Sequence, residues 1–377
     1  MKTLYTAITF CLLLCGSTAF AQSNTYFGNY FTHQCRDTNQ SGNYTWMYHP
    51  ELNGDSNAIT IFTPNSLTGG IDEDFHCGLW YNKNINRWTI YSEQGSSDTM
   101  PLYSGFNVLI PTANGTAFKH KVTAANIDFN VTLIDNPATN GKPNALLFIS
   151  HNWGVSGGVY NNRATGVYYN NLLQKWGIFN EDLSTFPENA VYNVFVVETS
   201  DANNAFIHTT GTPPLASDYL SYFDYAATAG SGKKVFVTHN LTPNGFNNQK
   251  YDTASVGVGY KGGNWLVYNR DKSTLDSGTT FNVLVANNLP TGIEDLYYND
   301  VAVQVYPNPS NGYITINHNL NTLAKAVITN AMGQQVAVFD LLQHNTQADI
   351  SQLPTGIYQL TVYNNQQRMA VKRLVKQ

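Results

Sequence analysis

Apolar and polar residues alternate along short segments of the chain, and Gly, Asn, Pro and Asp residues separate these segments. The segments 131–135, 166–170 and 191–197 are typical, because Val, Ile, Thr and aromatic residues dominate them. A period of two with this composition is typical of β-strands that bury one face. The pattern therefore predicts an all-β protein in which about six strands form each small sandwich or barrel.

The same sequence phrases recur three times. His33, His120 and His208 lie 87 and 88 residues apart. Other anchors keep nearly the same spacing: they are Asn65, Asn152 and Asn240, then Trp88, Trp176 and Trp265, and then Asn107, Asn193 and Asn282. Independent anchors at one spacing predict three tandem β-sandwich or barrel-like repeats of about 87 residues, over 28–112, 116–198 and 204–286.

The spacing does not decide how the repeats pack against one another. One body with pseudo-threefold symmetry and three independent units both fit the spacing. Each repeat is long enough to hold its own core, and the joins at 111–115 and 199–204 are short and polar. These features favour independent units.

The first 21 residues have the order of a signal peptide. Lys2 supplies the positive start, residues 8–15 form an apolar run, and Ala19 and Ala21 frame a small-residue cleavage site. The run is too short to cross a bilayer, and no later apolar stretch approaches about 18 residues, so we expect no membrane span. After cleavage Cys35 and Cys77 remain, and we expect them to form a disulfide; the alternative is two buried thiols.

Charge argues against two classes of protein. Charged residues make up 12% of the chain and aromatic residues 13%, and the net charge is −5. Disordered chains carry more charge and fewer aromatic residues. Nucleic-acid-binding proteins carry dense basic clusters, which this chain lacks, so we expect no nucleic-acid partner.

Catalytic motifs are missing from the sequence. It contains no nucleophile elbow, no HExxH helix and no intact phosphate loop, and we expect no cofactor and no metal. Five histidines recur between repeats, and recurrence favours a structural role; they are His33, His120 and His208, and then His151 and His239. The best catalytic pair that the sequence offers is His151 beside Glu181, for a hydrolase with its site between repeats.

Aromatic and amide residues gather in the second repeat. Asn152, Trp153, Tyr160 and Tyr168 suit the faces and hydroxyls of sugars, and we predict that they contact a ligand. Core aromatic residues give the same pattern, which is the alternative. The sequence thus favours a non-enzymatic secreted or cell-surface protein that binds glycan or another surface ligand and acts in adhesion. The other interpretations are the hydrolase and a structural surface component without a ligand.

The second repeat carries SHNW at 150–153 and KWGIFNED at 175–182. In this wording it resembles an uncharacterised repeat of secreted bacterial proteins. The resemblance covers 28–286 and departs most in the first repeat, where Pro64 replaces the histidine. It implies a shape and no chemistry.

The end of the chain differs in wording from the repeats. Its motifs are Val305, Tyr306, Pro307, Asn308, Pro309 and Gly312, then 330–334 with Gly333, then Leu353, Pro354, Thr355, Gly356, Ile357 and Tyr358, and finally the basic tail Lys372, Arg373 and Lys376. These motifs resemble the type A C-terminal sorting domain of the type IX secretion system in Bacteroidota.

That resemblance implies an Ig-like sandwich over 300–377 and export across the outer membrane. It also implies two partners, the secretion machinery and its sorting peptidase, and then attachment to surface lipopolysaccharide or release. The linker 287–299 would contain or adjoin the cut.

Overall fold

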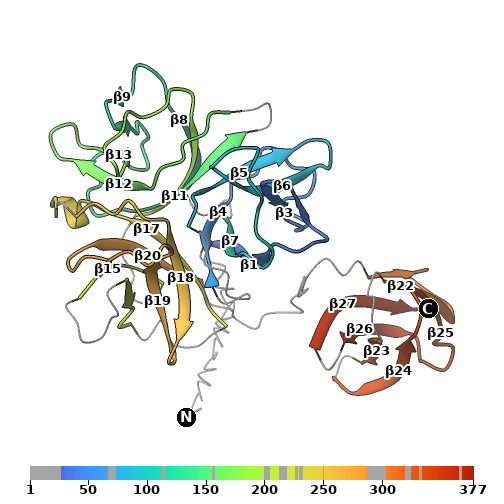
Figure 1. Ribbon diagram of the computed structural model, residues 1–377. Helices are drawn as coiled ribbons and strands as arrows, with labels where there is room; N and C mark the ends of the chain where they lie inside the picture. The colour runs from blue at the N-terminus through green and yellow to red at the C-terminus, as the bar shows by residue number, and fades with distance from the viewer. Residues whose placement is uncertain are drawn as a thin grey trace, which may run out of the picture.

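The computed structural model describes residues 27–66, 74–111, 116–154, 158–198, 204–211, 219–225, 228, 232–248, 250–286, 303–318, 324–330, 333–364 and 367–377. The expected signal peptide and the expected linker lie outside the described residues. The described elements are strands and one short 3-10 helix, η3 Pro243–Gly245 (Figure 1). The all-β prediction is confirmed. Within the described residues no helix is long and apolar enough to cross a membrane.

Each repeat consists of a three-stranded sheet and a meander of three or four strands, and the meander of the first repeat continues into the sheet of the second as one seven-stranded sheet. In the first repeat the sheet has the order β1 (Gly28–Gln34), β7 (Gly105–Pro111), β4 (Ile61–Pro64). The meander has the order β2 (Gln40–Ser41), β3 (Tyr44–Trp46), β6 (Arg87–Ser92), β5 (Cys77–Asn82).

The other two repeats keep this plan. In the second, the sheet is β8 (Thr116–Lys121), β14 (Val191–Val197), β11 (Leu146–Gly154), and the meander is β9 (Ile127–Asp128), β10 (Val131–Leu133), β13 (Lys175–Asn180), β12 (Thr165–Asn170). In the third, the sheet is β15 (Ala205–Thr209), β20 (Thr280–Ala286), β17 (Lys234–His239), and the meander is β16 (Leu220–Tyr222), β19 (Asn264–Asn269), β18 (Val256–Lys261).

A separate apolar core lies inside each repeat. Trp88, Trp176 and Trp265 are fully buried, one in each core. They occupy the central strand of each meander, where alternate side chains point inward. The recurring tryptophans of the sequence are therefore the centres of three sandwiches.

A fourth core joins the repeats, so the preference for independent units is wrong. Its buried residues come from all three repeats: Ile61 and Leu109 from the first, Leu146, Phe148, Phe195 and Val197 from the second, and Ala205, Phe236, Leu284 and Ala286 from the third. The three-stranded sheets thus bury both faces, one in their own sandwich and one against the other repeats. Figure 1 shows the three lobes around this common centre.

Asparagine side chains fasten neighbouring repeats in a closed ring. Asn107 Nδ2 donates to Val235 O at 2.9 Å, and Asn193 Nδ2 donates to Thr60 O at 2.9 Å. Asn282 completes the ring by donating to Leu147 O at 3.0 Å. Each donor side chain also accepts from the second recurring asparagine of its own repeat, which is Asn65, Asn152 or Asn240. The recurring asparagines are therefore structural.

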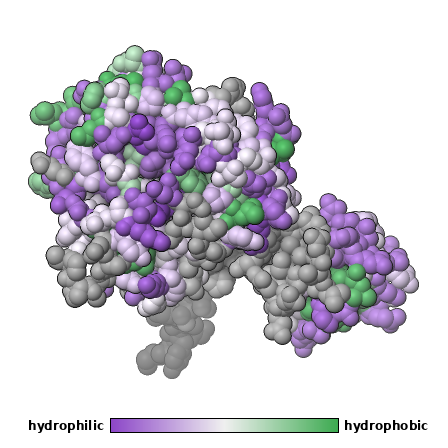
Figure 2. Space-filling view, viewed as in Figure 1, coloured by the Kyte–Doolittle hydropathy of each residue, from purple (hydrophilic) through white to green (hydrophobic). Residues whose placement is uncertain are grey.

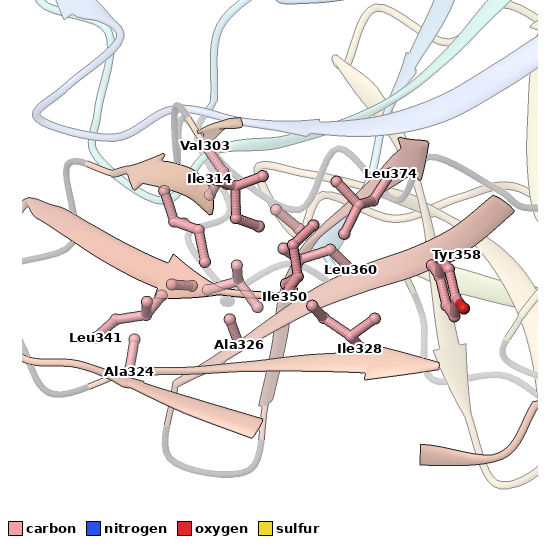
Figure 3. Close-up of a cluster of buried hydrophobic side chains, with 14 residues drawn as sticks. Val303, Ile314, Ala324, Ala326, Ile328, Leu341, Ile350, Tyr358, Leu360 and Leu374 are labelled. Atoms are coloured by element: carbon pink, nitrogen blue, oxygen red, sulfur yellow. The ribbon is translucent and has the colours of Figure 1, made fainter. Parts of the chain in front are cut away.

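The C-terminal domain is a sandwich of two sheets. Its three-stranded sheet is β21 (Gln304–Tyr306), β22 (Tyr313–Asn317), β25 (Asn345–Asp349). Its four-stranded sheet is β24 (Gln335–Leu341), β23 (Ala324–Thr329), β26 (Gly356–Asn364), β27 (Gln367–Lys376). Figure 3 shows aliphatic side chains such as Ile314, Ile328 and Leu360 meeting between the sheets.

Residues of the sorting motifs hold this sandwich together. Asn308, between Pro307 and Pro309, donates to Arg373 O at 2.6 Å and accepts from Val375 N at 2.9 Å, which ties the motif to the last strand. Tyr358 donates to Pro354 O at 2.7 Å. The motif residues thus have a structural reason to occur together.

The expected disulfide between Cys35 and Cys77 is not formed. The Cys35 thiol is buried and donates to Met100 O at 3.9 Å. Cys77 lies at the start of β5, where burial raises the pKa of its thiol to about 12, against the opposing effect of Arg270. Each thiol is accommodated at its own place in the first repeat, which is the alternative that the sequence left open.

Candidate functional site

The hairpin at the end of each meander reaches the next repeat. Parallel bridges join Leu79 to Asn152, Val167 to Asn240 and Val258 to Asn65. The ring closes because the third repeat returns to the first. We name the contacts the first interface (repeats one and two), the second interface (two and three) and the third interface (three and one).

A buried carboxylate meets an imidazole at two of these interfaces. Glu93 pairs with His151 Nδ1 at the first interface, and Glu181 pairs with His239 Nδ1 at the second. The second carboxylate oxygens accept backbone N–H groups, from Asn161 at 3.1 Å and from Asp252 at 3.1 Å. Each pair therefore joins two repeats by a charge-assisted contact.

Glycine makes room for these carboxylates. A Cβ atom on Gly78 would lie 2.4 Å from Glu93 Oε1, and one on Gly166 would lie 2.5 Å from Glu181 Oε1. The hairpin strands β5 and β12 thus carry glycine opposite Tyr91 and Phe179 because an acidic side chain crosses them.

Different side chains hold the third interface together. Pro64 precedes Asn65 as His151 and His239 precede Asn152 and Asn240, so the equivalent position carries no imidazole. Arg270 stands where the other repeats have glutamate, and its Nη1 donates to Phe75 O at 3.2 Å and to Ser255 Oγ at 3.3 Å.

An axial cavity of about 130 Å³ lies where the three interfaces meet. Equivalent hydroxyls from the three repeats, Thr63, Ser150 and Thr238, line it, as do the two paired histidines. Its other polar lining residues are His76, Cys77, Glu93, Asn161, Arg163, Thr165, Glu181, Tyr192, Asp252 and Ser255. The cavity therefore combines donors and acceptors from every repeat.

Two polar atoms of the lining residues are buried without a hydrogen-bond partner among the described residues: His151 Nε2 and Asp252 Oδ2. Burial raises the pKa of Asp252 to about 6. Burial also lowers the pKa of His239, but the adjacent Glu181 carboxylate raises it, and the net shift is upward. The cavity lining is therefore polar, and some of its buried polar atoms lack a hydrogen-bond partner among the described residues.

An aromatic cluster covers the outer part of the first interface. Trp153 lies 6.1 Å from Trp80, 6.0 Å from Tyr91 and 5.3 Å from Tyr160, measured between ring centroids. Tyr44 extends the cluster at 5.2 Å from Trp80. Tyr160 is 36% exposed, and Trp153 Nε1 is buried without an acceptor among the described residues.

The ligand residues predicted from the sequence fall into three places. Trp153 and Tyr160 lie together in the aromatic cluster. Asn152 is buried and bonded to Asn193 at 2.8 Å, in the ring that fastens the repeats. Tyr168 lies at the second interface, where its ring centroid is 6.3 Å from that of Phe179.

Sequence reasoning missed Trp80 and Tyr91. The strand register makes Trp80 the equivalent of Tyr168, and Tyr91 the equivalent of Phe179. Because each hairpin serves the following repeat, Trp153 meets the aromatic residues of the first repeat. Leu241 takes the corresponding place at the second interface and Ser66 at the third, so the full cluster belongs to the first interface.

The recurring histidines separate into two groups. His33, His120 and His208 are buried, and each imidazole Nε2 is bonded to a hydroxyl, on Thr45 at 2.9 Å, Thr132 at 2.8 Å and Ser221 at 2.9 Å. These three have the structural role that recurrence predicts. The other two belong to the interface pairs.

The catalytic pair that the sequence offered is not formed, because Glu181 pairs with His239 and His151 pairs with Glu93. Within the described part of the chain, no group of three His, Cys, Asp or Glu side chains is arranged to hold a metal ion.

Comparison with known proteins identifies two regions. Residues 19–97, 78–196 and 166–285 each match the family described as "Domain of unknown function (DUF7452)". Together these matches cover well over half of the chain. The chain belongs to that family. Residues 304–377 match the family described as "Secretion system C-terminal sorting domain".

The overlaps between the DUF7452 matches follow the structure. Residues 78–97 and 166–196 are shared by consecutive matches. They contain most of the hairpins β5–β6 and β12–β13, which cover the following repeat. One family unit therefore includes the hairpin that the preceding repeat supplies.

No curated protein matches the chain. Among solved structures, "Biofilm associated protein - BSP domain" is similar at 10% identity with a TM-score of 0.19, over 93% of this chain and 81% of that one. A likeness at this level carries no argument about the repeats. The sorting domain does carry one: the protein is exported by the type IX route to the cell surface or the extracellular space, and its sorting domain interacts with the secretion machinery.

Proposed function

We propose that the three DUF7452 repeats form a non-enzymatic, carbohydrate-binding body that attaches the exporting cell to glycan. The ligand lies on the aromatic cluster of the first interface, with Trp153 and Tyr160 as its main contacts. The observation that carries the proposal is the cluster itself, in which Trp80, Tyr91, Trp153 and Tyr160 contact one another beside solvent.

The chemistry of these side chains supports a sugar ligand. Aromatic faces suit the C–H face of a sugar ring, and the indole N–H of Trp153 is a donor that still needs an acceptor. A buried N–H without an acceptor costs free energy, which a ligand hydroxyl would recover after a small movement of the ring. Since Leu241 and Ser66 replace the tryptophan elsewhere, each body has one such site.

Two further steps belong to the same proposal. The sorting peptidase cuts within or next to 287–299, and the released body is attached to surface lipopolysaccharide. Both steps come from the resemblance of the C-terminal motifs. Mass spectrometry of the surface fraction would test them, because a body that ends before residue 300 and carries added lipopolysaccharide mass is expected.

The test of the ligand is a glycan array and a pull-down on insoluble polysaccharides with the full chain. Trp153→Ala should weaken retention by about tenfold or more, which corresponds to about 1.4 kcal/mol. Tyr168→Ala is the control, since it removes the second-interface equivalent of Trp80, an aromatic side chain outside the cluster, and should leave retention unchanged.

A cooperative urea-unfolding transition, followed by the fluorescence of the remaining tryptophans, would show that both variants keep the fold. If the wild-type chain is retained on no glycan, or Trp153→Ala binds as well as the wild type, the proposal is wrong and a structural surface role takes its place.

A further inference from the structure

The base of the axial cavity is a ring of hydroxyls. Ser150 Oγ accepts the backbone N–H of Phe62 at 3.0 Å, and Thr238 Oγ1 accepts that of Ile149 at 3.3 Å. Thr63 Oγ1 accepts that of Val237 at 3.2 Å, which closes the ring. A hydroxyl that accepts one hydrogen bond still has its own hydrogen to donate. Three donors from three repeats therefore converge on the cavity.

Two imidazoles stand beside this ring. His151 is 6% exposed and His239 is 5% exposed, and in each the Nδ1 atom is taken by a glutamate. The His239 imidazole also has a hydrogen bond with the backbone of Lys250, whereas His151 Nε2 has no partner among the described residues. Buried polar atoms are normally hydrogen-bonded, and two exceptions among the residues of one cavity, His151 Nε2 and Asp252 Oδ2, indicate an absent partner.

The charges around the cavity argue against an ion as that partner. Each histidine already faces a glutamate, Arg163 pairs with Asp182 at 2.6 Å, and Asp252 adds a further carboxylate. Burial lowers the pKa of His76 to about 4, so this histidine is neutral and adds no positive charge. An anion would find no unpaired cation, and no three ligating side chains of the described residues meet at one point for a metal.

We propose that the axial cavity binds one small hydroxyl-rich molecule, a single sugar ring or a polyol, through His151, Asp252 and the ring of hydroxyls. The hydroxyls of such a molecule both donate and accept, as this mixture of an imidazole nitrogen, hydroxyls and a carboxylate oxygen requires. The cavity volume of about 130 Å³ suits part of one such ring, with the remainder at the open side.

This site is separate from the aromatic cluster. Trp153 and Tyr160 do not line the cavity. The axial site would therefore remain if the aromatic cluster bound nothing, and the two proposals can fail independently.

The test is isothermal titration of the full chain with glucose, galactose, N-acetylglucosamine and glycerol in turn, beside Zn²⁺ and inorganic phosphate. Saturable binding of at least one hydroxyl-rich probe is expected. Asp252→Asn keeps the size of the side chain and removes the unpartnered carboxylate oxygen, and should weaken that binding by about tenfold or more. Ala164→Phe fills the cavity from a lining position without removing a polar partner, and should abolish it.

Trp153→Ala is the control that separates the two sites: it removes any binding of the same sugars to the aromatic cluster, and the binding that Asp252→Asn weakens should persist in it. Absence of saturable binding by all four hydroxyl-rich probes would overturn the proposal. So would unchanged binding in Asp252→Asn and Ala164→Phe while their tryptophan fluorescence is native. Binding of Zn²⁺ or phosphate that Ala164→Phe abolishes, without binding of a hydroxyl-rich probe, would overturn it in favour of an ion site.

Discussion

The first and second interfaces each bury a carboxylate against an imidazole, whereas the third interface buries a guanidinium against a carbonyl oxygen. At the first two, Glu93 and Glu181 reach the histidine of the following repeat. At the third, Arg270 lies where glutamate would be, and Pro64 lies where histidine would be. The two residues of the pair have changed together.

The cost of burying an unpaired charge explains this coupling. Proline has no side chain that could neutralise a carboxylate, so a glutamate at position 270 would be buried without a counter-charge. Arg270 needs only acceptors, and Phe75 O and Ser255 Oγ supply them. The pseudo-threefold body therefore tolerates different charges at an interface where the residues on both sides differ together.

Breaking an intact pair should destabilise the three repeats most. Glu181→Ala leaves His239 buried without its carboxylate and should lower the free energy of unfolding by about 3–5 kcal/mol. Urea unfolding followed by tryptophan fluorescence would measure this. All six tryptophans lie between residues 46 and 265, so the signal reports on the three repeats alone.

The double variant Glu181→Leu/His239→Leu is the control, because replacing both members of a buried pair by apolar residues is often nearly neutral. If Glu181→Ala unfolds at the same urea concentration as the wild type, the pair contributes nothing to the stability of the interface.

A smaller effect is expected from converting the third interface into the form of the other two. Arg270→Glu alone buries an unpaired carboxylate and should cost about 3 kcal/mol. Adding Pro64→His supplies the missing imidazole and should recover at least half of that loss in the same urea assay. A double variant no more stable than Arg270→Glu would mean that the interfaces are not interchangeable.

Much of the fold was predictable because its signals are local and repeated. The alternation of apolar residues gave the strands, and the tryptophans Trp88, Trp176 and Trp265 marked the three cores. The sorting domain was recognisable from motifs whose side chains fasten its strands, such as Asn308 and Tyr358.

The common core could have been predicted but was missed. The segments 106–110, 192–197 and 281–286 are almost continuously apolar, and such strands bury both faces. In each, alternate residues divide between two cores: Val108 faces its own sandwich and Leu109 the common centre. The two-sided burial was the signal that the repeats form one body.

The candidate site was only partly predictable because its members come from different repeats. His151 was paired with Glu181 from the same repeat, whereas the true partner is Glu93. Glu93 and His151 are 58 residues apart, and so are Glu181 and His239. That common spacing is visible in the sequence. It can be explained only once the structure shows that each hairpin extends over the next repeat and brings its glutamate to the histidine there.

Ionisation of Asp252 distinguishes the second interface from the first, and its removal should change the stability least. Asp252 occupies at the second the place of Asn161 at the first, since each donates its backbone N–H to the interface glutamate. Burial raises the pKa of Asp252 to about 6, so between about pH 4 and pH 6 the folded chain holds a proton that the unfolded chain has lost. The contribution of Asp252 to stability therefore falls as the pH rises through this window.

Asp252→Asn should remove this slope and make the second interface resemble the first. The unfolding free energy of the variant minus that of the wild type, measured from pH 4 to pH 7.5, should increase as the pH rises. Burial lowers the pKa values of His33 to about 3 and of His120 and His208 to about 4, so these histidines destabilise both proteins as the pH falls and cancel in the difference. The carboxylates of Glu181 and Asp252 both raise the pKa of His239. Without Asp252 this pKa falls, so above pH 6.5 the variant loses less stability than the wild type as the pH rises. A difference that stays constant across the range would show that the Asp252 carboxyl ionises alike in the folded and unfolded chains, and that the second interface differs from the first in shape alone.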